Sequence, residues 1–121
     1  MSNGSQEEIM AKAEEWLGEA GAEFLLKLFG IYAAEADKCV AKLRRSFDEK
    51  DAVGFTQAAH TLKSSSANVG AASFSTLAKE IELASRGGRM AELAGQVARL
   101  EEEYLQVKIA LEAARAKYAV G

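Results

Sequence analysis

Apolar residues recur at intervals of three and four along most of this 121-residue chain. This interval is the repeat of an α-helix that buries one face. The pattern is most regular over residues 90–118, where apolar positions alternate in steps of four and three: Leu93, Val97, Leu100, Tyr104, Val107, Leu111, Ala114 and Tyr118. A seam of this kind is typical of a helix packed in a bundle.

Three further stretches show the same spacing. We expect helices at about 22–47, 51–68 and 72–85. A polar break precedes the second of them, and either Asp48 or Asp51 is suited to cap it. Gly70 is placed to end this helix in a left-handed conformation. The turn at 86–89 contains two glycines, which tolerate positive φ.

The N-terminus is less regular. Residues 1–6 are polar, and we expect them to form a disordered tail before a folded domain that spans residues 7–121. A short helix should follow the tail, because Ile9, Ala13 and Trp16 share one side, and Gly18 and Gly21 then interrupt it. The pattern as a whole predicts an all-α protein, an up-down four-helix bundle with a short extra N-terminal helix.

Composition supports this prediction. The chain contains no proline, whereas about six would be expected at the average usage of roughly 5%. The net charge of −3 argues against a nucleic-acid-binding protein. No apolar run approaches the ~20 residues of a membrane span, and the single cysteine excludes an intramolecular disulfide. We therefore expect a cytoplasmic protein that binds neither nucleic acid nor membrane.

The only histidine, His60, lies in the predicted helix 51–68. The apolar face of that helix is formed by Phe55, Ala59, Leu62, Ser66 and Val69. His60 lies one position away from this face, towards solvent, and Lys63 lies one turn further along the exposed side. An exposed imidazole beside a lysine indicates a functional residue rather than a packing residue.

Several uses of a single histidine fit the sequence poorly. An axial haem ligand points inward, and no Cys-x-x-Cys-His motif is present. A metal site needs several convergent ligands, and no second histidine can contribute. A hydrolase that pairs His60 with Ser64 would lack a nucleophile elbow.

Phosphorylation of the imidazole fits better. This chemistry needs an accessible ring nitrogen and a nearby cation, and Lys63 is within reach at i+3. It also needs a low surface around the ring, which the small side chains of Ser64, Ser65 and Ala67 provide.

From His60 to Gly70 the sequence reads His-Thr-Leu-Lys-Ser-Ser-Ser-Ala-Asn-Val-Gly. It resembles the motif of the histidine-containing phosphotransfer (HPt) domain, His-x-Leu-Lys-Gly-Ser-Ser with a glycine ten residues after the histidine. The resemblance extends over roughly residues 16–111. It implies a phosphorelay carrier without kinase activity, in which His60 takes a phosphoryl group from an aspartyl phosphate on one receiver domain and passes it to another.

The resemblance also implies roles for neighbouring residues. Lys63 corresponds to the lysine that steadies the phosphoryl group, and Gly70 to the glycine near the end of the histidine helix. Ser64 departs from the motif, because the family has glycine at this position, where the receiver approaches closely. Glu82 occupies a position where relatives place a glutamine or glutamate beside the site. The partner-docking residues are predicted to be Gln57, Ser64, Ala67 and Glu82, although a merely solvated side chain fits Gln57 equally well.

The expected partners are response-regulator receiver domains and a hybrid sensor histidine kinase. No cofactor is expected on this chain, and the Mg²⁺ should be on the receiver, beside the acceptor aspartate. A non-catalytic helical module that binds a receiver or kinase without phosphotransfer is the alternative, and the serine at position 64 favours it. A coiled-coil dimerisation module is a third reading, but the wide apolar faces of the other helices favour a monomer.

Overall fold

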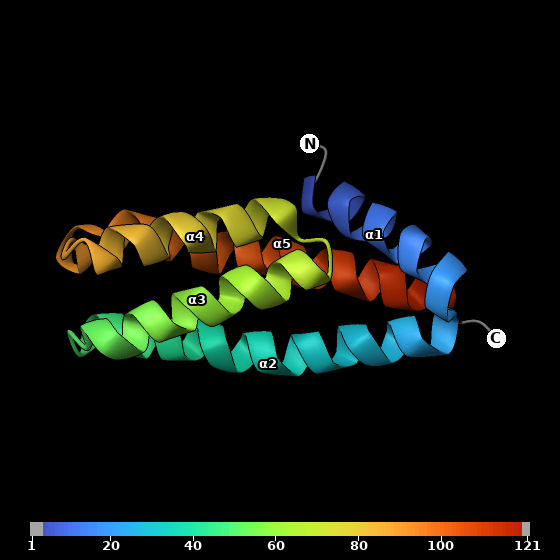
Figure 1. The fold of residues 1–121 in the computed structure, drawn as a ribbon, viewed down its shortest axis with the longest axis horizontal. Helices are drawn as coiled ribbons and strands as arrows, with labels where there is room; N and C mark the ends of the chain where they lie inside the picture. The colour runs from blue at the N-terminus through green and yellow to red at the C-terminus, as the bar shows by residue number, and fades with distance from the viewer. Residues whose placement is uncertain (1–3, 120–121) are drawn as a thin grey trace.

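The computed structural model describes residues 4–119, which form five α-helices and one 3₁₀ helix with no strand among them. The elements are α1 (Gly4–Ala20), α2 (Ala22–Asp48), α3 (Ala52–Asn68), α4 (Ala72–Arg86), the 3₁₀ helix η1 (Met90–Glu92) and α5 (Ala94–Tyr118). Helices α2 to α5 run alternately up and down the long axis (Figure 1). The predicted all-α bundle is therefore confirmed.

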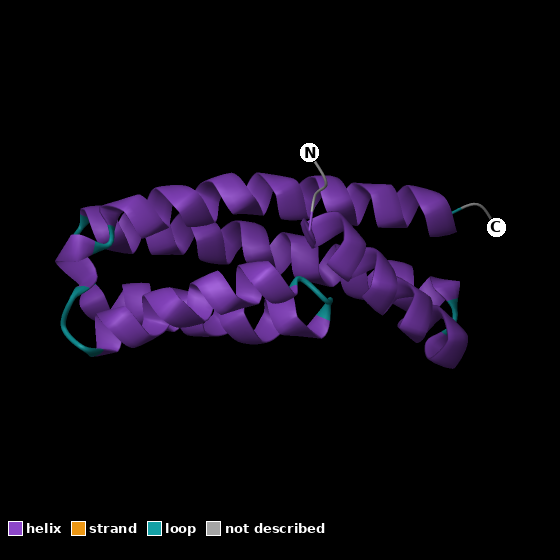
Figure 2. Ribbon diagram, turned by 90° about the horizontal axis from the view of Figure 1, so that it is seen from above, coloured by secondary structure: helices purple, strands orange, loops and turns teal. Residues whose placement is uncertain are grey.

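Helix α3 packs between α2 and α4, and α5 lies diagonally across the bundle from α3. The helices differ in length: α2 has 27 residues and α5 has 25, whereas α3 has 17 and α4 has 15. The longer pair therefore extends beyond the shorter pair, and α1 packs on α5 and α2 in the space beyond the end of α4 (Figures 1 and 2).

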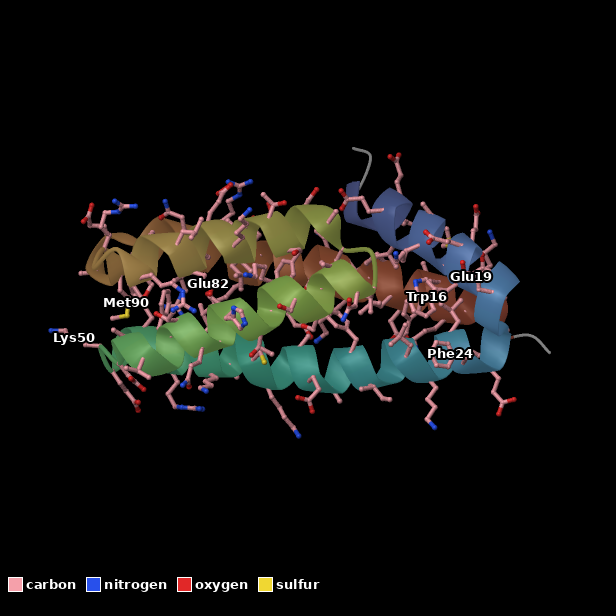
Figure 3. All side chains as sticks on the ribbon, viewed as in Figure 1. Trp16, Glu19, Phe24, Lys50, Glu82 and Met90 are labelled. Carbon is pink, nitrogen blue, oxygen red and sulfur yellow. The ribbon has the colours of Figure 1, made fainter. Side chains whose placement is uncertain are left out.

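The N-terminal helix is longer than the sequence predicted. It begins at Gly4, inside the expected tail, and its 17 residues equal the length of α3. Burial of Ile9 and Ala13 against the bundle, together with the stacking of Trp16 on Phe24 of α2, stabilises a helix that Gly18 alone would weaken (Figure 3). The predicted short helix is thus wrong in length; residues 1–3 of the predicted tail lie outside the described residues.

The predicted apolar faces of α3 and α5 lie in the core, to which α1, α2 and α4 also contribute. The five residues predicted for the α3 face are all buried, and so is the seam of α5 up to Ala114, with Tyr118 half-buried. A fully buried large apolar side chain contributes about 1.5–3 kcal/mol to stability. The first residue of the seam, Leu93, lies between η1 and α5 rather than in α5 itself. No helix among residues 4–119 is long and apolar enough to cross a membrane.

Both ends of α3 are fixed by specific contacts. Asp51 caps the first turn, where its carboxylate accepts a hydrogen bond of 3.0 Å from the Gly54 amide. At the other end Gly70 has φ of +87°, as predicted, and a Cβ there would lie 2.4 Å from Lys12 Cβ of α1. Between them, the buried hydroxyls of Tyr32 and Ser66 lie 2.7 Å apart and tie α2 to α3. These contacts set the rotation of α3 and therefore the direction of His60.

Candidate functional site

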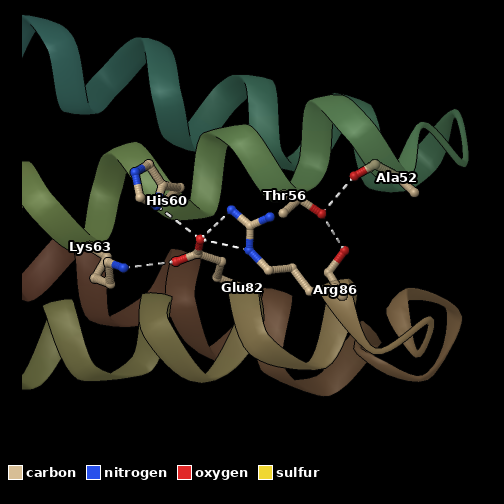
Figure 4. A network of polar contacts seen from close by, with 7 residues as sticks. Ala52, Thr56, His60, Lys63, Glu82 and Arg86 are labelled. Carbon is tan, nitrogen blue, oxygen red and sulfur yellow. Dashed lines mark hydrogen bonds and ion pairs between the residues drawn. The ribbon is translucent and has the colours of Figure 1, made fainter.

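His60 projects from the middle of α3, and its side chain is 53% exposed. Its neighbour Ala59 is fully buried, so the ring lies at the edge of the core-facing side of the helix. The Nδ1 atom of the ring lies 2.9 Å from Oε2 of Glu82 on α4 (Figure 4). The predicted exposure of His60 is confirmed, and one of its two ring nitrogens is anchored to the neighbouring helix.

The carboxylate of Glu82 lies between α3 and α4, and its side chain is only 5% exposed. Its Oε1 atom lies 3.1 Å from Nζ of Lys63. Its Oε2 atom accepts hydrogen bonds from Nη2 and Nε of Arg86, at 2.7 and 3.0 Å, in addition to its contact with His60 (Figure 4). Burial of an ionised carboxylate without partners would destabilise the fold, but both oxygens of Glu82 have hydrogen-bond donors.

The packing of α4 on α3 is polar on both sides of Glu82. In one direction along the helices, the Ser75 hydroxyl donates to the Lys63 carbonyl at 2.7 Å. In the other, the hydroxyls of Thr56 and Ser85 lie 2.7 Å apart, and Thr56 donates to the Ala52 carbonyl (Figure 4). These bonds hold α4 in one register against α3, so that Glu82 meets the histidine ring.

The ionisation of Glu82 determines which nitrogen of His60 carries the proton in the neutral ring. Burial raises the pKa of Glu82, but the hydrogen bonds from Arg86, Lys63 and His60 outweigh it and lower the pKa to about 2. The carboxylate is therefore ionised at neutral pH and can only accept, so Nδ1 of His60 must be the donor. In the neutral ring the lone pair is then on Nε2, which lies on the side of the ring away from Glu82 (Figure 4).

The geometry thus presents an exposed imidazole. In its neutral form Nδ1 holds the proton, and the lone pair of Nε2 is free to act as a nucleophile. A sequence model of the Hpt domain family matches residues 27–117. The chain belongs to the Hpt domain family. Hpt domains are phosphocarrier modules without kinase activity of their own, and they act in phosphorelays with receiver domains and histidine kinases. Neither a curated protein nor a solved structure matches the chain significantly.

The family match extends from α2 to nearly the end of α5 and leaves α1 outside. In this Hpt domain α1 nevertheless contacts the start of α4, just after the turn that follows the histidine helix. The carboxylate of Glu8 accepts hydrogen bonds from the backbone amide and the hydroxyl of Ser73, at 3.2 and 2.8 Å, in the first turn of α4. Because α4 has no side-chain cap of its own, Glu8 satisfies one of its free amides from another helix.

The exposed face of α3 brings together most of the residues predicted for docking. Gln57, Ser64 and Ala67 are exposed on the same side of α3 as His60. Val53, which the sequence analysis did not single out, extends this face and is 69% exposed. A docking partner would therefore meet a low surface of small and polar side chains on either side of the ring.

The structure corrects the role predicted for Glu82. Docking requires an accessible side chain, whereas Glu82 is buried beneath His60, Lys63 and Arg86. Its position allows it to orient the ring rather than to contact a partner. Gly70, by contrast, lies in the turn after α3, where its positive φ and the closeness of α1 both require glycine.

Sequence reasoning missed Arg86, which was assigned to the turn after α4. Its side chain is 57% exposed but its guanidinium binds Glu82, four residues earlier on the same helix. The signal was present, because a glutamate four residues before an arginine is a favourable helical pair. Lys63 is placed as predicted beside the ring, but its ammonium faces Glu82 and its side chain is only 32% exposed.

Glu82→Gln should remove a contribution to the free energy of unfolding that the wild type loses at acid pH. The pKa of Glu82 is about 2 in the folded protein against an ordinary value of 4.5, so its ionised form stabilises the fold above pH 4.5. That contribution, at most about 3 kcal/mol, is lost as the pH falls towards 2. The difference in free energy of unfolding between wild type and Glu82→Gln, measured with urea, should therefore shrink over this range. A difference that stays constant between pH 2 and 6 would contradict the ionic network.

Proposed function

We propose that this Hpt domain is a histidine phosphocarrier in a two-component phosphorelay. His60 takes a phosphoryl group from the aspartyl phosphate of one receiver domain and passes it to the aspartate of another. The contact between Nδ1 of His60 and the ionised carboxylate of Glu82 carries this proposal. It fixes the proton on Nδ1 and leaves the nucleophilic lone pair on the exposed side of the ring.

The transfer is a displacement at phosphorus. The Nε2 lone pair forms the N–P bond while the P–O bond to the receiver aspartate breaks, and the electron pair leaves with the aspartate carboxylate. The ring then has Nε2 bonded to phosphorus while Nδ1 retains its proton, so it is positively charged beside the Glu82 carboxylate, 2.9 Å away. In the onward step the ring leaves as neutral imidazole rather than as an imidazolate, which makes it a better leaving group.

The cations around Glu82 support the phosphoryl group in this proposal. Lys63 and Arg86 together carry two positive charges against the single negative charge of Glu82. The incoming phosphoryl group therefore meets a net positive field, in which Lys63 has the phosphate-stabilising role that the family resemblance implies. The Mg²⁺ used by this chemistry is expected on the receiver.

Lys63→Ala should slow phosphotransfer from a phosphorylated receiver about tenfold. A charge-assisted hydrogen bond contributes roughly 1.5–3 kcal/mol, and solvent screens part of it at this partly exposed site. Lys27→Ala, which removes an exposed lysine near the start of α2, is the matched control and should transfer at the wild-type rate. Equal rates for the Lys63→Ala and Lys27→Ala proteins would show that Lys63 takes no part.

The buried seam of α5 supports a monomer, because the apolar residues that a coiled-coil dimer would need are used inside the bundle. Size-exclusion chromatography at several concentrations tests this, and a dimer at micromolar concentration would contradict it. The cytoplasmic location stays a prediction.

The alternative proposal is a module that binds receivers or kinases without phosphotransfer, which the serine at position 64 favours. Incubation with phosphorylated receivers separates the two functions. A phosphocarrier acquires acid-labile, base-stable phosphate, as expected for phosphohistidine, and then loses it to a second receiver. A protein that binds the receivers but stays unphosphorylated would support the alternative.

A further inference from the structure

The orientation of the His60 ring determines where a phosphoryl group would lie. The two nitrogens of an imidazole point away from each other across the ring. Because Nδ1 is bound to Glu82 on α4, a group attached to Nε2 projects away from α4 (Figure 4). The cations of the network, Lys63 and Arg86, lie on the Glu82 side and are already paired with its carboxylate.

A different lysine approaches the exposed face of α3 from its other neighbour, α2. The Nζ atom of Lys42 donates a hydrogen bond of 3.3 Å to Oε1 of Gln57. Gln57 lies one turn before His60 on the exposed face of α3, and residues three apart on a helix have their Cβ atoms about 5–6 Å apart. The ammonium of Lys42 is therefore held on the α2 side of the exposed face of α3, against the residue one turn before His60.

The charge of Lys42 is not compensated as those of Lys63 and Arg86 are. Its partner is a neutral amide, and among the described residues it forms no ion pair. Helix α3, from Ala52 to Asn68, contains no acidic residue that could compete for it. A full positive charge with no ion-pair partner among the described residues is thus held at Gln57, one turn before His60.

We propose that Lys42 is a second cation that binds the phosphoryl group on Nε2 of His60, in addition to Lys63, and that Gln57 holds Lys42 in place before the group arrives. On phosphorylation, the ammonium exchanges the neutral amide oxygen of Gln57 for a phosphoryl oxygen, which is a stronger acceptor because the bond becomes charge-assisted on both sides. The four-carbon stem of lysine permits this movement. The inference rests on the proposed function, and it adds a phosphoryl-binding residue from α2 to a site otherwise built from α3 and α4.

The test uses a small phosphodonor, so that receiver docking plays no part. The full chain is phosphorylated with potassium phosphoramidate, and the phosphohistidine signal is titrated by ³¹P NMR. A nearby cation favours the dianionic phosphoryl group and lowers the pKa of its second ionisation. Lys42→Ala should therefore raise that pKa by about half a unit, a modest shift because the site is exposed to solvent.

Two controls make the result specific. Lys42→Arg keeps the charge and should titrate like the wild type, and Lys27→Ala removes a lysine from the far end of α2 and should have no effect. An identical phosphoryl pKa in wild type and Lys42→Ala would overturn the assignment of Lys42. Failure of the wild type to exchange phosphate with receivers would count instead against the proposed function, so the two failures are distinguishable.

Discussion

His60→Gln should carry no acid-labile phosphate after incubation with a phosphorylated receiver, under conditions in which the wild type is labelled. His60 is the only histidine of the chain, so no second imidazole can accept the phosphoryl group. The glutamine amide can still donate a hydrogen bond to Glu82, and more than half of the His60 side chain that it replaces is exposed. Substitution at such a position changes stability by only about 0.5 kcal/mol.

The variant must be shown to be folded for this result to count. Circular dichroism and thermal unfolding of His60→Gln should match the wild type, because none of the core contacts of α3 is removed. Acid-labile, base-stable phosphate on the variant at the wild-type level would rule out His60 as the phosphorylated residue.

Ser64→Tyr should block transfer from a receiver. Ser64 is exposed one turn beyond His60 on the same face of α3, and the histidine nitrogen must come within about 3–3.5 Å of the phosphorus, in line with the bond that breaks. A tyrosine ring at this position would hold the receiver away from the imidazole. Transfer measured over time with one receiver should fall to the background given by His60→Gln.

The control for bulk is Ala98→Tyr, since Ala98 is exposed on α5, diagonally across the bundle from α3. This variant should transfer at the wild-type rate. Normal transfer by Ser64→Tyr would show that the receiver docks elsewhere, and the exposed face described around His60 would then be wrong.

Replacing Ser64 by glycine tests the role of its hydroxyl. If Ser64 is only tolerated in place of the family glycine, Ser64→Gly transfers at the same rate or faster. If the hydroxyl binds the phosphoryl group, Ser64→Gly transfers more slowly. The second result would make the departure from the family motif a functional feature of this chain.

The helices and the exposure of His60 could be predicted because both depend on local periodicity. The positions that share a helix face follow directly from a repeat of 3.6 residues, and the apolar positions of α3 and α5 are strongly periodic. The length of α1 could not be predicted in this way. Its helical structure across Gly18 depends on contacts with distant parts of the chain, including the burial of Ile9 and Ala13.

The network around Glu82 could be predicted only in part. The i, i+4 spacing of Glu82 and Arg86 is visible in the sequence, but the contact with His60 joins two helices across 22 positions of the chain. It depends on how the turn at Gly70 sets the register of α4 against α3. The burial of Glu82 follows from that register, which is why a residue assigned to docking from the sequence proves to be buried beneath the ring.

The central claim is that Glu82 holds the proton on Nδ1 of His60 and leaves Nε2 as the nucleophile. NMR of the protein labelled with ¹⁵N in its single histidine tests this directly. Before phosphorylation, the ring nitrogen shifts of the neutral imidazole should show a proton on Nδ1 and a lone pair on Nε2. After phosphorylation, the ³¹P–¹⁵N coupling should place phosphorus on Nε2. A neutral imidazole with its proton on Nε2, or phosphorus bonded to Nδ1, would contradict the account.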